Sequence, residues 1–444
     1  MGCPLVFFPN CMLRSDKSTL VAFAIGAMLR IGWALIHPHA LIWDEEFYFA
    51  QTDQLALGQP IPVSIWPPGW PALVAPLFKL FGAQLQVGVW LNVALSLGIL
   101  VGVVILAQQM FGPTYRTSAA WCVALTPSFI VVNALFMYEV WLQLLLVIAM
   151  LYTMRSNQTR ATWIIVGLCA GLAGLIRPFW LALPALVGLI YWARFRCLPN
   201  LKQSALAQAL AILVVLPWVW QQSILAQRFV PVTLNGGLNL WIGNHPGANG
   251  TYTDPPAAFW EPTNDVVATR EAVAYIRAHP IQTLAVLPAK IWYLFNQEHP
   301  VSILFARTRY TVSPEMISIF RVILDTSYYI TLIGALIQSI LFERQKRRAA
   351  LCLWWLVAFN VIAHLPFFGV PRFNWPVRFV SIIYFAYACQ ALLSRWQNRY
   401  ESKRDLVCAA AASSVLATAP GITSTFELSA TGSPDGAVRQ HKRD

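Results

Sequence analysis

Residues 87–110 read VGVWLNVALSLGILVGVVILAQQM and contain no charged side chain. About 20 apolar residues are enough for a helix to cross the hydrocarbon core of a bilayer. The whole chain shares this bias, because 57% of its 444 residues are hydrophobic and only 11% are charged. Soluble globular proteins have about 45–50% apolar and about 25% charged residues. The composition therefore excludes a soluble enzyme, a disordered scaffold and a disulfide-stapled secreted domain, and it predicts an all-α polytopic membrane protein.

Apolar runs recur along the chain and predict about ten transmembrane helices. These are residues 18–37, 87–110, 117–136, 139–154, 161–177, 179–194, 204–222, 316–342, 349–368 and 377–395. Two more apolar runs, 70–81 and 283–295, are interpreted as interfacial helices within two large loops, 38–86 and 223–315. Residues 70–81 are too few to cross the bilayer. If residues 283–295 formed a span, every later loop would lie on the opposite side of the membrane. Residues 401–444 are rich in Ala, Ser, Thr and Gly and are expected to form a disordered tail after a membrane domain that ends near residue 400.

Basic residues indicate how these helices are oriented. With a cytoplasmic N-terminus, the short inside loops carry most of the cations, including a cluster of Arg344, Lys346, Arg347 and Arg348. This agrees with the positive-inside rule, so we expect both termini in the cytoplasm of a bacterial cell and an inner (plasma) membrane protein with two large outer loops. The formal charge of +12 reflects this bias first. No stretch interleaves basic and aromatic residues as nucleic-acid binding would require, so no nucleic-acid partner is expected.

Ionisable residues also gather at the predicted outer ends of the helices. They are Asp44, Glu45 and Glu46 after the first span, Glu139 at the start of the fourth, Arg177 between the fifth and sixth, and Arg372 and Arg378 in the last outer turn. Such groups at a membrane boundary are costly and suggest function. Simpler explanations exist, because carboxylates favour helix starts and arginines can reach the interface or anchor an aromatic belt. Arg30, inside the first span, could reach outward or neutralise an acid or a phosphate.

Motifs in the first outer loop resemble those of the GT-C superfamily of membrane glycosyltransferases. This superfamily includes protein O-mannosyltransferases, aminoarabinose transferases and lipid A galacturonic acid transferases. The similarity covers residues 15–395, and its motifs in order are WDEEFYFA (43–50), LGQP (57–60), WPPGWP (66–71), APLFKLFG (75–82), MFGP (110–113), Glu139, GLAGLIRP (171–178), GLNLWIGNHPG (237–247) and GTY (250–252). Two positions depart from the pattern: Trp66 stands where some members have Lys, and Glu139 stands where several have Asp.

The resemblance implies transfer of a sugar, with inversion, from a polyprenyl-phosphate donor to a lipid, glycan or protein acceptor at the outer membrane face. Asp44 matches the superfamily's catalytic aspartate, so it is expected to act as general base, and Glu45 beside it is the second expected catalytic residue, which would position the acceptor or donor. Glu139 and Glu46 would position the acceptor or donor, and a divalent cation is possible at Glu45 and Glu139. The phosphate leaves as a stable anion, so cations suffice to stabilise it. The candidates for binding this phosphate follow from their positive charge and their predicted place on the outer side of the membrane. They are Arg177, Arg372, Arg378 and Lys79.

A transporter or lipid flippase is the alternative from another functional class. Transporters commonly have inverted repeats and broken helices with polar groups near the middle of the bilayer. The sequence shows no internal repeat, and the predicted spans contain few acids. The ionisable residues gather at one membrane face instead, which favours chemistry at an interface.

The predicted topology can be tested with reporter fusions. A reporter fused at Gln203 should report the cytoplasm, and one fused at Gly250 should report the outer side, because one span separates them. Paired alkaline phosphatase and green fluorescent protein fusions measure this directly. If both positions report the same side, the assignment of residues 204–222 as a single span is wrong.

Overall fold

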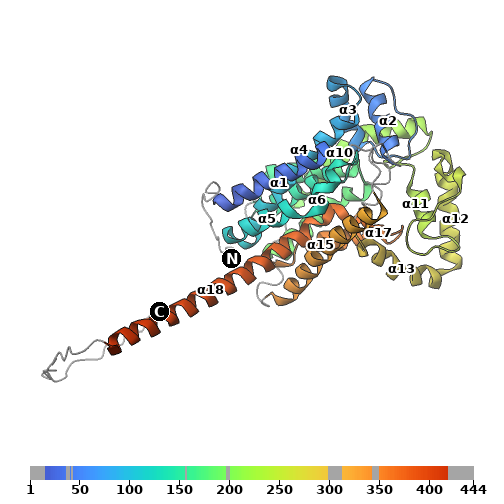
Figure 1. The fold of residues 1–444 in the computed structure, drawn as a ribbon. Helices are drawn as coiled ribbons and strands as arrows, with labels where there is room; N and C mark the ends of the chain where they lie inside the picture. Colours follow the sequence, from blue (N-terminus) through green and yellow to red (C-terminus); the bar gives the residue numbers. More distant parts are fainter. Residues whose placement is uncertain are drawn as a thin grey trace, which may run out of the picture. The chain divides into compact units, whose positions relative to one another are not determined.

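The computed structural model describes residues 16–36, 41, 44–155, 158–196, 201–298, 313–342 and 350–418. All regular elements within these residues are helices (Figure 1), which confirms the predicted all-α class for this part of the chain. The contacts divide the chain into two units after Ala391. The elements are α1 (Lys17–Ile36), α2 (Asp44–Ala56), α3 (Gly69–Phe81), α4 (Leu85–Phe111), η1 (Pro113–Tyr115), α5 (Arg116–Leu125), α6 (Pro127–Val131), η2 (Val132–Ala134), α7 (Glu139–Thr153), α8 (Arg160–Gly174), η3 (Pro178–Ala182), α9 (Leu183–Phe195), α10 (Leu201–Leu225), α11 (Gly236–Gly243), η4 (Ala257–Trp260), η5 (Pro262–Asn264), α12 (Asp265–Ala278), α13 (Pro280–Phe295), α15 (Pro314–Leu341), α17 (Trp354–His364), η6 (Pro371–Val377) and α18 (Phe379–Thr418).

Several of these helices are suited to a bilayer. Among the described residues, α1, α4, α10, α15 and the segment Pro178–Phe195 are long and apolar enough to cross, which makes five candidate spans. Two bent pairs, Pro113–Leu125 with Pro127–Ala134 and Pro371–Val377 with Phe379–Glu401, raise the number to seven if each pair is one span. Large apolar side chains of α10 and α15 are exposed, which is unfavourable in water over so long a stretch. The protein is therefore an integral membrane protein.

Three predicted spans correspond to shorter helices. The predicted spans 139–154, 161–177 and 349–368 correspond to α7, α8 and α17, which have 15, 15 and 11 residues. A helix of 15 residues rises about 23 Å, which is less than the thickness of about 30 Å of a hydrocarbon core. The count of ten spans therefore stays a prediction.

The two apolar runs that we interpret as interfacial are both helical, as α3 and α13. The structure differs from the prediction after residue 401, where α18 continues to Thr418 instead of giving way to a disordered tail. The four consecutive alanines at 409–412 explain the difference, because alanine has the highest helix propensity. Residues 419–444 of the predicted tail lie outside the described residues.

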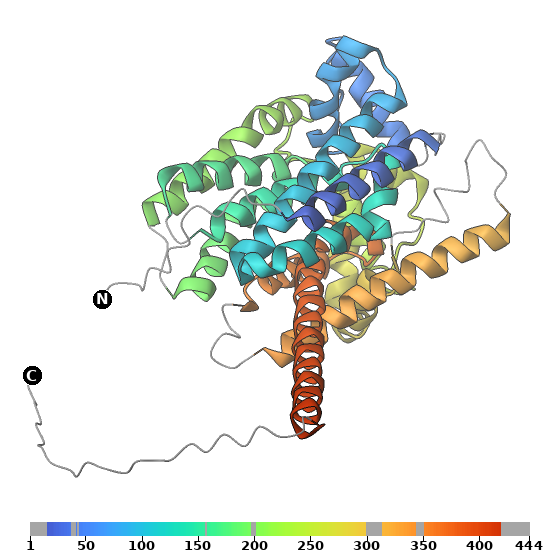
Figure 2. The same cartoon turned by 60° about the vertical axis from the view of Figure 1, so that its left-hand side comes forward.

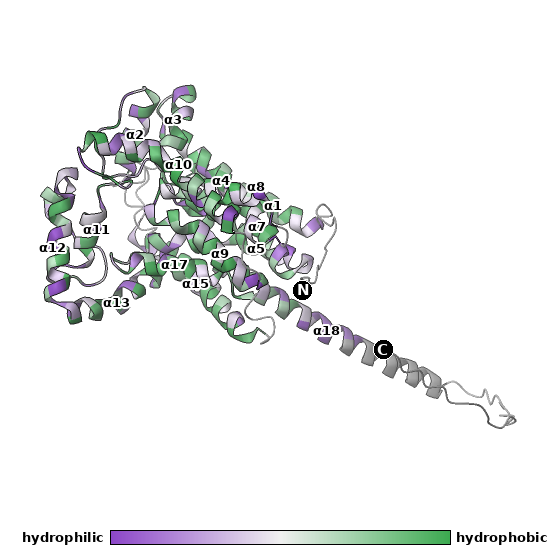
Figure 3. Cartoon of the chain, turned by 180° about the vertical axis from the view of Figure 1, so that it is seen from behind, coloured by the Kyte–Doolittle hydropathy of each residue, from purple (hydrophilic) through white to green (hydrophobic). Residues whose placement is uncertain are grey.

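The buried core forms around α4 and α7. Helix α4 contacts α5 and α7, α1 packs on α4 and α5, and α8 packs on α7 and α10. Figures 1 and 2 show α1, α4 and α5 side by side, and Figure 3 shows mostly apolar residues in these helices and more polar ones in α12. The short helix η6 contacts α7, α13 and α17. This junction brings distant segments of the chain to the start of α7.

A buried arginine stabilises the break between α5 and α6. Pro127 has no N–H group, so the carbonyl of Val123, four residues earlier, cannot receive the usual helical hydrogen bond. Arg30 of α1 supplies the donor: its Nη2 lies 3.0 Å from the Val123 carbonyl oxygen, and its Nε donates to Ser96 Oγ at 2.9 Å. Backbone groups in lipid must find partners within the protein. Arg30 therefore donates hydrogen bonds to backbone carbonyls. It neither reaches outward to the interface nor neutralises an acid or a phosphate, the two roles predicted for it.

We expect Arg30→Met to lower the free energy of unfolding by about 3 kcal/mol, because it leaves buried carbonyls without a donor. Pro127→Ala restores an N–H group next to the Val123 carbonyl. In that background the loss caused by Arg30→Met should be smaller by about 1 kcal/mol. Thermal unfolding of the four proteins in detergent measures the coupling. Equal losses in both backgrounds would show that Arg30 does not serve this carbonyl.

Candidate active site

Two carboxylates and one guanidinium form the centre of the candidate site. Asp44 is the first residue of α2, and Glu139 is the first residue of α7. Acidic residues are favourable there, because the N-terminus of a helix carries partial positive charge. Arg372 belongs to η6, which packs on α7. Local helix preference therefore explains where the acids lie in the sequence, and helix packing brings the arginine to them.

Arg372 bridges the two acids. Its Nη1 donates to Asp44 Oδ2 at 2.6 Å, and its Nε donates to Glu139 Oε1. The side chain of Glu139 is 1% exposed, whereas that of Asp44 is 27% exposed. Glu139 is thus enclosed in the protein, and Asp44 is accessible. Among the described residues no hydrogen bond involves Asp44 Oδ1, so this oxygen can accept a proton from a bound molecule.

Tyr138 joins a second arginine to this cluster. The tyrosine hydroxyl accepts a hydrogen bond from Arg177 Nη2 at 2.7 Å and one from Arg372 Nη2 at 3.3 Å. The Arg177 guanidinium also lies 4.2 Å from the centre of the Phe373 ring. In the part of the chain that the structure describes, Arg177 forms no ion pair with a carboxylate. Tyr138 is not among the residues predicted for the site; its one signal in the sequence is its position directly before Glu139.

A close backbone contact positions Arg177. The N–H of Gly69 donates to the Leu175 carbonyl oxygen at 3.0 Å. A Cβ atom at Gly69 would lie 2.6 Å from Ile176 Cγ1, which is too close for any side chain. The WPPG motif of the first loop therefore fits directly against the residues that precede Arg177, and only glycine allows this contact.

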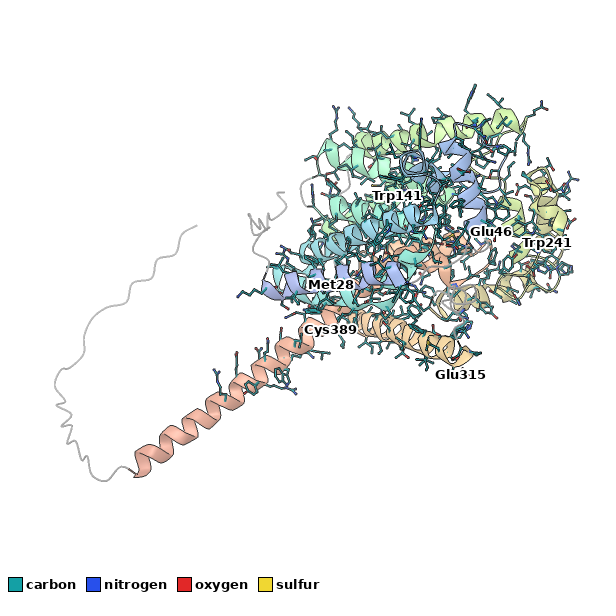
Figure 4. All side chains as sticks on the ribbon, turned by 45° about the horizontal axis from the view of Figure 1, so that its top comes forward. Met28, Glu46, Trp141, Trp241, Glu315 and Cys389 are labelled. Carbon is teal, nitrogen blue, oxygen red and sulfur yellow. The ribbon has the colours of Figure 1, made fainter. Side chains whose placement is uncertain are left out.

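Glu45 and Glu46, which follow Asp44, have different surroundings. Glu45 is 1% exposed, and its Oε1 accepts a hydrogen bond from the Phe136 N–H at 2.6 Å. This bond ties α2 to the segment that leads into α7. Glu46 is exposed on α2, where Figure 4 labels it. The structure therefore places Glu45 as an anchor behind Asp44 and Glu46 on the surface.

Two of the predicted phosphate-binding residues lie apart from the cluster. Arg378 forms a buried ion pair with Glu298, and its guanidinium lies 4.0 Å from the centre of the Tyr328 ring. The backbone N–H of Glu298 donates to Asp325 Oδ1 at 2.7 Å, so this pair links η6 to α15. Lys79 is exposed in the last turn of α3, and no hydrogen bond or ion pair within the described residues joins it to the cluster.

The donor set does not fit a divalent cation. No group of three or more His, Cys, Asp or Glu side chains in the described part of the chain could hold a metal ion. Asp44 and Glu139 both direct an oxygen to the same guanidinium. Magnesium and calcium require several oxygen ligands around one point, and here a positively charged side chain occupies that point.

A buried lysine that sequence analysis did not single out holds the segment leading to Arg372. Lys290 of α13 is 1% exposed, and its Nζ donates to Asn244 Oδ1 at 3.1 Å and to the Leu365 carbonyl oxygen at 3.0 Å. Asn244 Nδ2 donates to the Pro366 carbonyl oxygen at 2.6 Å. Burial lowers the pKa of Lys290 to about 8, because the ammonium group loses hydration. The GLNLWIGN motif thus fastens residues 365–366, and a lysine within an apolar run was its sequence signal.

Comparisons with known proteins show what part of the chain is similar to. Residues 65–220 match the family model described as dolichyl-phosphate-mannose-protein mannosyltransferase. The predicted resemblance to the GT-C superfamily is confirmed. The matched residues contain Gly69, Tyr138, Glu139 and Arg177, which belong to the site and its support. No curated protein is similar enough in sequence to match the chain.

Two solved structures of one archaeal enzyme share the fold. The oligosaccharyltransferase of Archaeoglobus fulgidus in complex with zinc and sulfate aligns with a TM-score of 0.52 and 15% identity, covering 89% of this chain and 51% of that chain. Its apo form aligns with a TM-score of 0.52 and 13% identity, covering 88% and 52%. ArnT from Cupriavidus metallidurans, bound to undecaprenyl phosphate, aligns with a TM-score of 0.40 and 12% identity over 83% of this chain and 76% of that chain. The chain spans about half the length of the archaeal enzyme.

The lowered pKa of Lys290 predicts a pH dependence of stability. In the unfolded chain lysine titrates near pH 10.4, whereas in the folded protein its pKa is about 8. Between these values the unfolded chain binds the additional proton, so the free energy of unfolding rises with pH. Wild type should gain stability relative to Lys290→Met, on the order of 3 kcal/mol, from about pH 8 to pH 10.4. Thermal unfolding of both proteins at several pH values measures the difference, and parallel pH profiles would contradict it.

Proposed function

We propose that the protein is an inverting glycosyltransferase that moves a sugar from a polyprenyl-phosphate donor to a lipid, glycan or protein acceptor at the outer face of the membrane. The observation that carries the proposal is the accessible carboxylate of Asp44, held by Arg372 beside the cation Arg177. The match of residues 65–220 to the mannosyltransferase model supports the reaction class. The fold shared with the archaeal oligosaccharyltransferase is consistent with it.

Asp44 acts as general base in this proposal. Its Oδ2 accepts from Arg372, so Oδ1 takes the proton of the acceptor hydroxyl. The acceptor oxygen forms a bond to the anomeric carbon of the sugar, on the face opposite the phosphate. The bond between that carbon and the phosphate oxygen breaks, and the phosphate keeps the electron pair. One displacement inverts the configuration, and the anionic leaving group needs no general acid.

Arg177 binds the carrier phosphate in this proposal. Its charge is not balanced by a carboxylate within the described residues, and it lies beside Tyr138 at the edge of the cluster. A guanidinium can donate two parallel hydrogen bonds to phosphate oxygens. Arg372, Arg378 and Lys79 are not needed for this role, because two of them form ion pairs with acids and the third is exposed away from the cluster.

The donor's chemistry suggests the location of the site. A polyprenyl chain lies in the hydrocarbon core while its phosphate and sugar lie at the interface. The acids at the starts of α2 and α7 would then face the outer side, under loops 38–86 and 223–315, with both termini in the cytoplasm. The predicted ten-span topology of a bacterial inner membrane protein belongs to this proposal.

We expect Asp44→Asn to reduce transfer at least ~100-fold, because an amide cannot accept the acceptor's proton. Mass spectrometry of envelope glycolipids and glycoproteins can first identify the product that is lost in a deletion strain. Wild type should restore this product, and Asp44→Asn should not.

Asp53→Asn is the matched control, because it makes the same change on the same helix away from the cluster. It should restore the product as wild type does. Immunoblotting of membranes checks that all variants accumulate equally. Full restoration by Asp44→Asn would contradict the assignment of the base.

A further inference from the structure

We propose that Arg372 takes the place of a divalent cation, so that sugar transfer by this protein requires no metal ion. The inference rests on the proposed function for its catalytic part. One structure of the archaeal enzyme that shares the fold contains zinc and sulfate, and two acids that lie close together are common ligands of a divalent cation. In the present chain the guanidinium of Arg372 lies between Asp44 and Glu139.

The geometry of the two ion pairs supports this role. Arg372 uses different nitrogens for the two acids, Nη1 for Asp44 and Nε for Glu139. One side chain therefore fixes two carboxylates that belong to different helices, as a bridging metal ion would. A guanidinium stays charged at any physiological pH. Because it is covalently part of the protein, it cannot dissociate into solution as a metal ion can. The arrangement of the acids would then be independent of the supply of metal ions.

Burial makes this arginine necessary. Glu139 is 1% exposed, and its Oε2 is a buried atom without a hydrogen-bond partner. Removing one partner of a buried ion pair leaves an uncompensated charge, which is strongly unfavourable. Without Arg372, Glu139 would need another cation or a proton. A divalent cation shared with Asp44 could meet that need, so removal of the arginine should create a metal site.

The surrounding backbone holds Arg372 in position. The N–H of Gly369 donates to the Gly250 carbonyl oxygen at 2.9 Å, and Asn360 Nδ2 donates to the Phe373 carbonyl oxygen at 3.1 Å. Lys290 fastens the same segment further upstream through the Leu365 carbonyl oxygen. Arg372 is therefore a positioning residue for Asp44 and Glu139. The turn that carries it is held in place by these hydrogen bonds, so its guanidinium contacts the two acids without bound substrate.

Metal binding can be compared directly between wild type and Arg372→Ala. Electron paramagnetic resonance of purified protein in detergent, titrated with Mn²⁺, should detect no binding to wild type that depends on Glu139. Arg372→Ala should bind Mn²⁺ above this background, and the double variant Arg372→Ala/Glu139→Gln should lose that binding. Mn²⁺ bound by wild type and lost in Glu139→Gln would overturn the inference.

Activity supplies a second, separate measurement. Transfer by wild type should be unchanged by EDTA, whereas Arg372→Ala should slow it at least about 100-fold. Loss of wild-type activity in EDTA, restored by Mn²⁺, would overturn the inference even if Arg372→Ala does not fold. Failure of wild type to transfer any polyprenyl-phosphate sugar would count against the proposed function alone, and the Mn²⁺ titration would still decide the role of Arg372.

Discussion

A carboxylate that is removed from water needs a cation beside it. In this protein two carboxylates, Glu139 and Asp44, share one cation, Arg372. Glu139 is almost fully buried at the start of α7, where Arg372 is its ion-pair partner. Because the guanidinium also reaches Asp44, the position of α2 is coupled to that of η6. The short helix η6 in turn packs on α7, α13 and α17. The charge requirement of one buried acid therefore connects α2, near the start of the chain, with η6, near its end.

Similar requirements of polar groups in apolar surroundings explain the other unusual contacts. The carbonyl that Pro127 leaves without a helical partner receives a hydrogen bond from Arg30. The ammonium group of Lys290 is shared between a carbonyl and Asn244, which keeps residues 365–366 in place. In each case a group that lipid or protein interior cannot solvate finds a partner from a distant segment. The Lys290 contacts also hold the segment that leads to Arg372.

Much of the helical framework could be predicted, because apolar runs and helix-start acids are local properties of the sequence. The runs 87–110, 204–222 and 316–342 all became long helices, and 70–81 became α3. The sequence was a weaker guide to which side chains pair with one another, because such pairs depend on the tertiary structure. Arg372 and Arg378 are equivalent by charge and position in the sequence, yet one binds Asp44 and Glu139 while the other binds Glu298. Tyr138, Lys290 and Asn244 showed no more than faint signals for the same reason.

The sequence by itself determined that this is a helical membrane protein and which acids begin its helices, since hydrophobicity and helix-dipole preferences act over a few residues. It also carried the motifs on which the resemblance to the GT-C superfamily rests. Only the tertiary structure decided which cation each acid receives, that Glu45 faces inward while Asp44 stays accessible, and that the WPPG motif packs against the residues before Arg177. Ion pairs and close contacts depend on distances between segments far apart in the chain, and only the packed helices fix those distances.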